Sequence, residues 1–380
     1  MFSLAELGRM ITDRARLEAH VAAFQRVVTP ESVVLDIGAG TGIMSLLACK
    51  AGARRVYALE PSGTVQILLA AARDNGLADR VVVLQQRSTE VTLPERADII
   101  VSDLRGVLPP HGAHFADLAD ARRRLLAPGG RLLPMRDTLW LAVLSAPEEF
   151  ARRQAAWRSE PQGLDLRSAL PFVANEVEKC RARADQLLGA PIRWASLEYL
   201  TLADAAVRGS AASTIARDGM AHGVVVWFDT ELVEGIGYSN GPGAAADSIY
   251  GQIFFPWPEA VALRTGDRVS VEVRADPIGS DYIWTWATDI QSGPGAVTRF
   301  RQSTFNSSPP SPASVRNRAT SFVPALSAAG QEALEILEGM RSGRTIGELA
   351  RQLQAQHPDR FPSLDQAHGL AAALAQRYGA

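Results

Sequence analysis

The segment VVLDIGAGTG, residues 33–42, decides the fold class of this 380-residue chain. Its first five residues form an apolar run typical of a buried strand, and glycines follow at positions 38, 40 and 42. Glycine lets the backbone approach a ligand closely, and a helix that begins after the glycines presents free N–H groups at its first turn. The pattern therefore predicts a strand, a tight turn and a helix, with a ligand bound at the turn.

Strand-like and helical runs alternate after this segment. We expect helices over 42–52 and 64–75, and strands over 55–60, 81–86 and 97–103. Strands separated by helices of this length imply a parallel sheet with crossover helices. Apolar residues at helical spacing over 3–27 predict one further helix ahead of the sheet.

The second half of the chain has a β pattern. Apolar or alternating runs predict strands over 223–229, 249–257, 269–275 and 282–290, and turn sequences separate them. This part is expected to be a barrel or sandwich. The domains that we expect are an N-terminal helix (1–30), an α/β domain (31–145), an irregular segment with a β domain (146–304), a linker (305–324) and a small helical module (325–380).

Composition excludes several classes of protein. The chain has 39 Lys and Arg residues against 41 Asp and Glu residues, a formal charge of −2, which disfavours a nucleic-acid-binding surface. Two cysteines are too few for a disulfide framework, and no His/Cys cluster has metal-ligand spacing. An apolar run of membrane-spanning length is absent from the sequence, and charged residues at the N-terminus do not fit a signal peptide. We expect a soluble, cytoplasmic protein without a bound metal.

Two acidic residues accompany the glycines. Asp36 lies two residues before the first glycine, and Glu60 ends the next predicted strand, where a carboxylate can accept both hydroxyls of a ribose. A dinucleotide motif would place its last glycine at position 43, where Ile43 stands. A nicotinamide-dinucleotide site and a glycine turn with no ligand remain the alternatives.

With these residues the chain resembles the class I S-adenosylmethionine-dependent methyltransferases, in which LDIGAGTG is the glycine motif and Glu60 matches the ribose-binding acid. The segments GRMITDRARLEAHVAAF, KAGARRVYALE, LPERADIIVSD and LAPGGRLLP narrow the resemblance to the protein arginine methyltransferases, over roughly residues 3–300.

The resemblance implies a Rossmann-like cofactor domain, a β-barrel, a dimerisation arm at about 160–182 and therefore a homodimer. The cofactor would be S-adenosyl-L-methionine and the product S-adenosyl-L-homocysteine. The resemblance implies that Arg16, in the N-terminal helix, pairs with the cofactor carboxylate. The other residues implied to bind the cofactor are Asp36, Gly38, Gly40, Gly42 and Glu60, with Ser88 and Thr89 near the adenine.

Two motifs depart from the family pattern. The family clamps its substrate guanidinium with two glutamates on one loop, where this chain has Asp103 and Gly112. A guanidinium stays protonated and requires paired acids, so a single shorter acid beside Arg105 is a poor clamp. The Thr-His-Trp motif of the barrel is replaced by Ser-Ile-Tyr at 248–250. We therefore expect an altered acceptor site.

Methyl transfer requires an aligned acceptor and, for a hydroxyl or protonated amine, removal of a proton. Asp103 and His111 are the predicted catalytic residues, because they follow a strand end at the cofactor edge. Arg105, His114 and Tyr250 are the predicted substrate residues, and Arg105 could hold an anionic group. The structural alternatives are an Asp103–Arg105 ion pair or turn cap, and solvated loop positions for both histidines.

The leading hypothesis is thus a methyltransferase whose acceptor is a peptide or protein side chain or a small metabolite. One alternative is arginine N-methylation with a reduced acidic clamp, and another is a non-catalytic cofactor-binding scaffold. The predicted helical module at 325–380 resembles small winged-helix modules that bind peptide leaders in bacterial peptide-modifying systems. A helical appendage that packs on the barrel or at a dimer contact is the alternative for this module.

Overall fold

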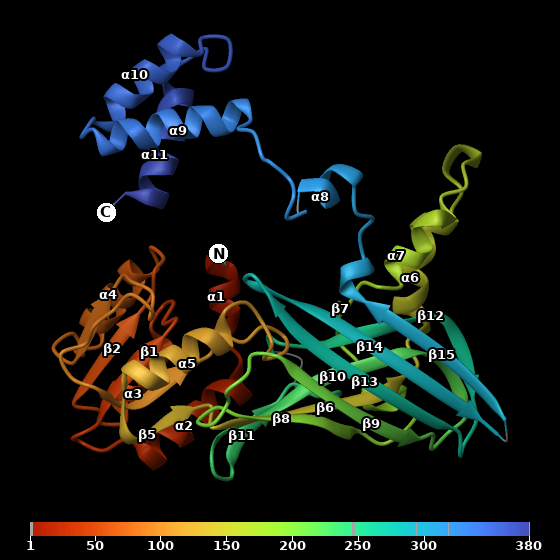
Figure 1. The fold of residues 1–380 in the computed structure, drawn as a ribbon. Coiled ribbons are helices and arrows are strands. Elements are labelled where there is room, and N and C mark those ends of the chain that lie inside the picture. The colour runs from red at the N-terminus through yellow and green to blue at the C-terminus, as the bar shows by residue number, and fades with distance from the viewer. Residues whose placement is uncertain (1–2, 245–247, 294, 318, 380) are drawn as a thin grey trace. The chain divides into compact units, whose positions relative to one another are not determined.

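The computed structural model describes residues 3–244, 248–293, 295–317 and 319–379 (Figure 1). Contacts divide the chain into two compact units, Met1–Pro309 and Pro310–Ala380. Among the described residues, no helix combines the length and the hydropathy needed to cross a membrane.

The first unit begins with two helices. These are α1 (Leu4–Met10) and α2 (Arg14–Val27), so the prediction of one continuous helix over 3–27 was wrong. The break has a local cause, because Asp13 caps a new helix there, as Ser3 does at the start of α1. Ser3 forms a capping box with Glu6, and the Asp13 side chain accepts a hydrogen bond from the Arg16 N–H.

A five-stranded parallel sheet follows, in the order β3-β2-β1-β4-β5. Its strands are β1 (Val33–Ile37), β2 (Arg55–Leu59), β3 (Val81–Leu84), β4 (Ala97–Ser102) and β5 (Leu126–Leu133). The crossover helices are α3 (Ile43–Lys50), α4 (Val65–Asp74) and α5 (His114–Arg124). Every residue of β1 is buried, as expected for a central strand covered on both faces. The strand order reverses between β1 and β4, and ligands bind at this edge of open α/β sheets.

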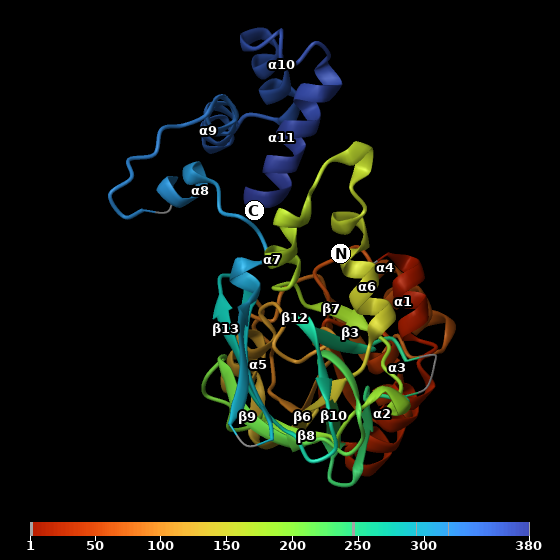
Figure 2. The same cartoon turned by 90° about the vertical axis from the view of Figure 1, so that its right-hand side faces the viewer.

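Two antiparallel sheets form the β domain and curve around a shared core (Figure 2). One has the order β7-β12-β10-β6-β8 with β11 paired to β10, and the other has the order β15-β14-β13-β9. Their strands are β6 (Arg136–Leu144), β7 (Glu178–Cys180), β8 (Ile192–Glu198), β9 (Val207–Thr214), β10 (Gly219–Val233), β11 (Ile236–Ser239), β12 (Gln252–Leu263), β13 (Arg268–Ile278), β14 (Asp281–Ser292) and β15 (Ala296–Ser303). Strand β6 lies before the expected boundary at residue 145, yet it pairs with β8 and β10.

The segment between β6 and β8 is mostly short helices. It contains α6 (Pro147–Arg158), the 3-10 turns η1 (Pro161–Gly163), η2 (Arg167–Ala169) and η3 (Ala184–Gln186), α7 (Leu170–Val173) and β7. A last 3-10 turn, η4 (Thr304–Asn306), follows β15. Together these elements confirm the predicted fold class, a Rossmann-like α/β domain followed by an antiparallel β domain and C-terminal helices.

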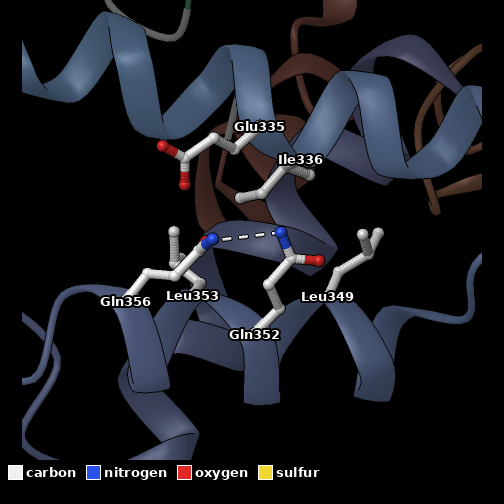
Figure 3. Close-up of a pocket in the computed structure, with 6 residues that line it drawn as sticks. All are labelled: Glu335, Ile336, Leu349, Gln352, Leu353 and Gln356. Carbon is white, nitrogen blue, oxygen red and sulfur yellow. Dashed lines mark hydrogen bonds between the residues drawn. The ribbon is translucent and has the colours of Figure 1, made fainter.

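The second unit is helical, with α8 (Pro312–Asn317), α9 (Ala328–Arg341), α10 (Ile346–Gln356) and α11 (Leu364–Tyr378). Ile336, Leu349, Leu353 and Phe361 form its own core. Figure 3 shows a narrow pocket between α9 and α10, where the Gln352 side chain donates to that of Gln356 at 3.3 Å. The described residues of this unit include no strand, so the wing of a winged-helix module is not seen in them.

Candidate active site

The turn at residues 38–42, here called the glycine turn, connects β1 to α3 at the centre of the parallel sheet (Figure 1). Gly38, Gly40 and Gly42 all have positive φ angles, of 76°, 54° and 90°. A Cβ atom at Gly38 would lie 2.4 Å from Leu104, and one at Gly42 would lie 2.4 Å from Leu68. Both the backbone conformation and the close packing therefore require glycine at these two positions.

Asp36 lies beneath the glycine turn and is almost completely buried. The Ser45 hydroxyl donates a 2.6 Å hydrogen bond to its carboxylate. Because Ser45 lies in α3 and Asp36 in β1, this bond connects the helix to the end of the strand. Burial raises the pKa of Asp36 to about 6, and the hydrogen bond from Ser45 opposes part of that rise.

Glu60 follows β2 and is half-buried beside the glycine turn. Its carboxylate accepts one hydrogen bond from the Gly40 N–H at 3.0 Å and another from the Ser62 N–H at 2.8 Å. These two bonds fix the carboxylate at the carboxyl edge of the sheet. Ser88 is buried and Thr89 is exposed in the turn after β3, the next strand of the sheet beyond β2.

Asp103 directly follows β4, on the other side of the reversal in strand order. Arg16 of α2 donates to its carboxylate at 2.5 Å, and the Tyr250 hydroxyl lies 2.7 Å from both carboxylate oxygens. Arg105 donates to it as well, at 3.1 Å and 3.0 Å. Burial alone would raise the pKa of Asp103, but the two guanidinium groups hold that pKa well below its usual range. Asp103 is therefore ionised and a weak proton acceptor.

Arg105 has a completely buried side chain. It donates to both carboxylate oxygens of Asp137 on β6, at 2.8 and 3.1 Å, and to the Thr230 hydroxyl at 2.7 Å. Tyr238 of β11 accepts another hydrogen bond at 2.5 Å. We call the connected groups the acid–arginine network; they are Arg16, Asp103, Arg105, Asp137, Tyr238 and Tyr250. The ion pair that was the alternative for Asp103 is present, at 3.0 Å.

The segment 248–250 ties the N-terminal helices to the β domain. The Ile249 N–H donates to the Asp13 carboxylate at 3.0 Å, while the other oxygen of that carboxylate accepts from the Arg16 N–H at 3.2 Å. Tyr250, the next residue, reaches Asp103. The residues that replace the family's barrel motif therefore contact both α2 and the end of β4.

The predicted histidines lie in different surroundings. His111 is exposed on the loop after β4, beside Gly106. His114 is buried in α5 against Phe115 and Tyr199, and neither ring nitrogen has a hydrogen-bond partner in the described structure. Burial, with Arg105 nearby, lowers the pKa of His114 to about 3, so its ring is neutral and its contacts are those of a core residue.

The structure brings four of the predicted site residues, Arg16, Asp103, Arg105 and Tyr250, together at one edge, with further partners that the sequence did not indicate. Asp137, Thr230 and Tyr238 come from three β-domain strands and complete the coordination of Arg105. His20 was also missed; it is buried, and its Nδ1 lies 2.8 Å from the Arg16 carbonyl oxygen. Burial and Arg16 lower the pKa of His20 to about 4. The sequence did contain one signal for these partners: Asp137 is a polar residue at an inward position of a strand, and such a residue requires a buried hydrogen-bond partner.

A separate cavity of about 520 Å³ lies along the segment between β6 and β8. Its lining residues are Arg152, Arg153, Trp157, Val173, Glu176, Val177, Glu178, Thr304 and Ser307. None of them is a predicted site residue. The buried charges concentrate at the sheet edge instead, which makes that edge the candidate site.

Comparisons with known proteins find methyltransferases. The family model for ribosomal protein L11 methyltransferase (PrmA) matches residues 18–131. A probable protein arginine N-methyltransferase 6 from Arabidopsis thaliana is 35% identical over 179 residues, which are 46% of this chain and 41% of that protein. Protein arginine N-methyltransferase 1 from Saccharomyces cerevisiae is 27% identical over 260 residues, 65% of this chain and 73% of that protein.

Solved structures extend the likeness to the fold. The enzyme–prozyme complex of Trypanosoma brucei PRMT1 with AdoHcy has a TM-score of 0.72 at 22% identity, covering 78% of this chain and 96% of that one. Arabidopsis thaliana protein arginine methyltransferase 10 gives a TM-score of 0.69 at 21% identity, with the same coverage. The chain spans only 41% and 40% of the first two curated relatives. The predicted resemblance to protein arginine methyltransferases is confirmed, in sequence over part of the chain and in fold over more than three quarters of it.

Proposed function

We propose that this chain is an S-adenosyl-L-methionine-dependent methyltransferase with an arginine-methyltransferase-like scaffold. The observation that carries the proposal is the Glu60 carboxylate, which two backbone N–H groups hold beside a turn of three positive-φ glycines. This arrangement lies at the point where the strand order reverses, which is the usual nucleotide position in an open α/β sheet. The relatives named as methyltransferases support the same activity.

The residues at this edge fit the cofactor. The half-buried Glu60 carboxylate is available to ribose hydroxyls, and Gly38 and Gly40 leave the turn free of side chains there. Arg16 is a buried cation at the same edge and suits the cofactor carboxylate, whereas Ser88 and Thr89 would lie near the adenine. When bound, the cofactor supplies an electrophilic methyl group on a sulfonium.

Side chains of the protein position one another and accept the proton. Asp103 stays ionised, and it orients Arg16 and Tyr250 by direct hydrogen bonds. His111, on the exposed loop after β4, is the group that we propose to accept a proton from the acceptor. The acceptor that we propose is a peptide or protein side chain or a small metabolite.

Binding of S-adenosylhomocysteine, measured by calorimetry, tests the cofactor assignment. Glu60→Ala removes a charged hydrogen-bond acceptor, and affinity should fall by about 10- to 100-fold. Gly40→Val places a branched side chain at a φ of 54° and should also weaken binding. Glu259→Ala, at an exposed glutamate of β12, is the matched control and should bind normally. If the wild-type protein does not bind S-adenosylhomocysteine, the proposal is wrong.

A labelled-methyl screen against peptides, cell extract and small metabolites tests transfer. Label on an acceptor, lost in His111→Gln but retained in the exposed-histidine control His368→Gln, would support the assigned roles. Cofactor binding without transfer to any acceptor would favour the scaffold alternative.

We also propose that the chain forms a homodimer through the segment around 160–182. Leu164 is 62% exposed and Leu166 is 39% exposed, although both are apolar. Replacing both with aspartate should convert a dimer to a monomer in light scattering, whereas a wild-type mass of one chain would contradict the proposal.

A further inference from the structure

Arg105 satisfies every requirement of a bound guanidinium group. All three of its nitrogens donate hydrogen bonds, to Asp103, Asp137, Thr230 and Tyr238. Its guanidinium carbon lies 5.0 Å from the centre of the Phe228 ring and 5.6 Å from that of Tyr238. Paired carboxylates and aromatic faces are the groups that recognise a planar, permanently charged fork.

The groups around Arg105 have other contacts that keep them in place. Asp137 also accepts from the Tyr199 hydroxyl at 2.6 Å. Asp103 also accepts from Arg16 and Tyr250. Hydrogen bonds to groups other than Arg105 therefore also hold each carboxylate in place. The groups around Arg105 thus form a binding site for a guanidinium, and the Arg105 side chain occupies that site.

The charges point the same way. Two carboxylates, Asp103 and Asp137, pair with two guanidinium groups, Arg16 and Arg105, and all four side chains are at most 10% exposed. Loss of Arg105 alone would leave one buried negative charge uncompensated, in a space shaped for a guanidinium.

We infer that Arg105 is a specificity-determining residue, which fills a guanidinium receptor formed by Asp103, Asp137, Thr230 and Tyr238. An arginine side chain from another molecule is thereby excluded from the Asp103 carboxylate. The acceptor class then consists of groups without a guanidinium. This last step rests on the proposed methyltransferase function, whereas the receptor itself does not.

Chemical rescue tests the receptor. Arg105→Ala removes the side chain beyond Cβ, and ethylguanidinium replaces the missing atoms. At about ten times its Kd, ethylguanidinium should raise the melting temperature of the variant by about 2–4 °C. Ethylammonium, which has the charge but not the fork, should give a smaller rise. Wild-type protein should not respond, because Arg105 occupies the receptor.

Arg136→Ala is the matched control variant. Arg136 is the neighbour of Asp137 on β6 and also pairs with two acids, Glu198 and Glu231, but its side chain is 39% exposed. Solvent fills that position, so ethylguanidinium should not stabilise this variant. Equal shifts in both variants, or no shift in Arg105→Ala, would overturn the receptor.

A variant that does not fold still gives an answer. Refolding of Arg105→Ala with ethylguanidinium should then recover more soluble protein than refolding with ethylammonium, and equal yields would count against the inference. These measurements contain neither cofactor nor acceptor, so they are independent of the S-adenosylhomocysteine experiment. If ethylguanidinium rescues the variant but the wild type methylates arginine peptides, the guanidinium receptor stands and the role of Arg105 in acceptor specificity is wrong.

Discussion

The glycine turn and the acid–arginine network lie at the same edge of one sheet, but they are built differently. At the turn, Glu60 bonds to Gly40, only 20 residues away along the chain. In the network, Arg105 reaches Thr230 over 125 residues, and Asp103 reaches Tyr250 over 147 residues. The glycine turn is therefore a local structure, whereas the acid–arginine network exists only when both domains are folded together.

The largest effect should come from breaking the network. Asp137→Asn keeps the shape of the side chain but leaves the Arg105 charge with one acid fewer in a completely buried site. We expect the free energy of unfolding to fall by about 3–5 kcal/mol, measured by urea denaturation. Asp276→Asn removes an acid from an exposed pair with Arg208 and should change it by about 1 kcal/mol or less. Similar losses in both variants would contradict the special position of Asp137.

A smaller effect is expected at the glycine turn. Gly42→Ala combines a φ of 90° with an overlap against Leu68, and it should cost about 2–4 kcal/mol. Gly76→Ala has a similar φ of 67° but open space around its Cβ, so it isolates the backbone contribution. Equal urea midpoints for these two variants would show that packing on Leu68 is unimportant.

Asp36 should give a stability change of the opposite sign. Its pKa in the folded protein is about 6, above the ordinary value of 3.8, so its contribution to stability is complete below pH 4 and is lost as the pH rises through 6. Asp36→Asn cannot ionise and should therefore be more stable than wild type at pH 7, by about 1–3 kcal/mol. The difference should vanish near pH 4 in parallel urea titrations. A variant that is less stable at pH 7 would mean that the carboxylate is needed in its charged form.

The smallest expected effect concerns the hydrogen bond to this carboxylate. Ser45→Ala removes the donor that lowers the pKa of Asp36, at a cost of about 1 kcal/mol at neutral pH. The pH window in which stability declines should move upward. An unchanged window would show that the Ser45 hydroxyl has little influence on the Asp36 proton.

Local pattern explains which features could be predicted. Strand β1 was expected at 33–37 and lies there, because an apolar run ends at glycines, which favour a turn. The pairing of Asp103 with Arg105 was considered because they are two residues apart. By contrast, nothing near Tyr238 or Thr230 in the sequence indicates that either side chain contacts Arg105. Those contacts depend on the register of β10 with β6 and β11, which a single sequence does not contain.

The Asp13 carboxylate joins the N-terminal helices to the residues ahead of β12. One of its oxygens caps α2 and the other binds the Ile249 N–H ahead of β12. The Ile249 hydrogen bond therefore connects the N-terminal helices to residues 248–250, and separating the two segments breaks that bond while the cap of α2 stays intact. Asp13→Ala removes the acceptor of both amide protons, so the Arg16 and Ile249 amides should each exchange with deuterium faster than in the wild type.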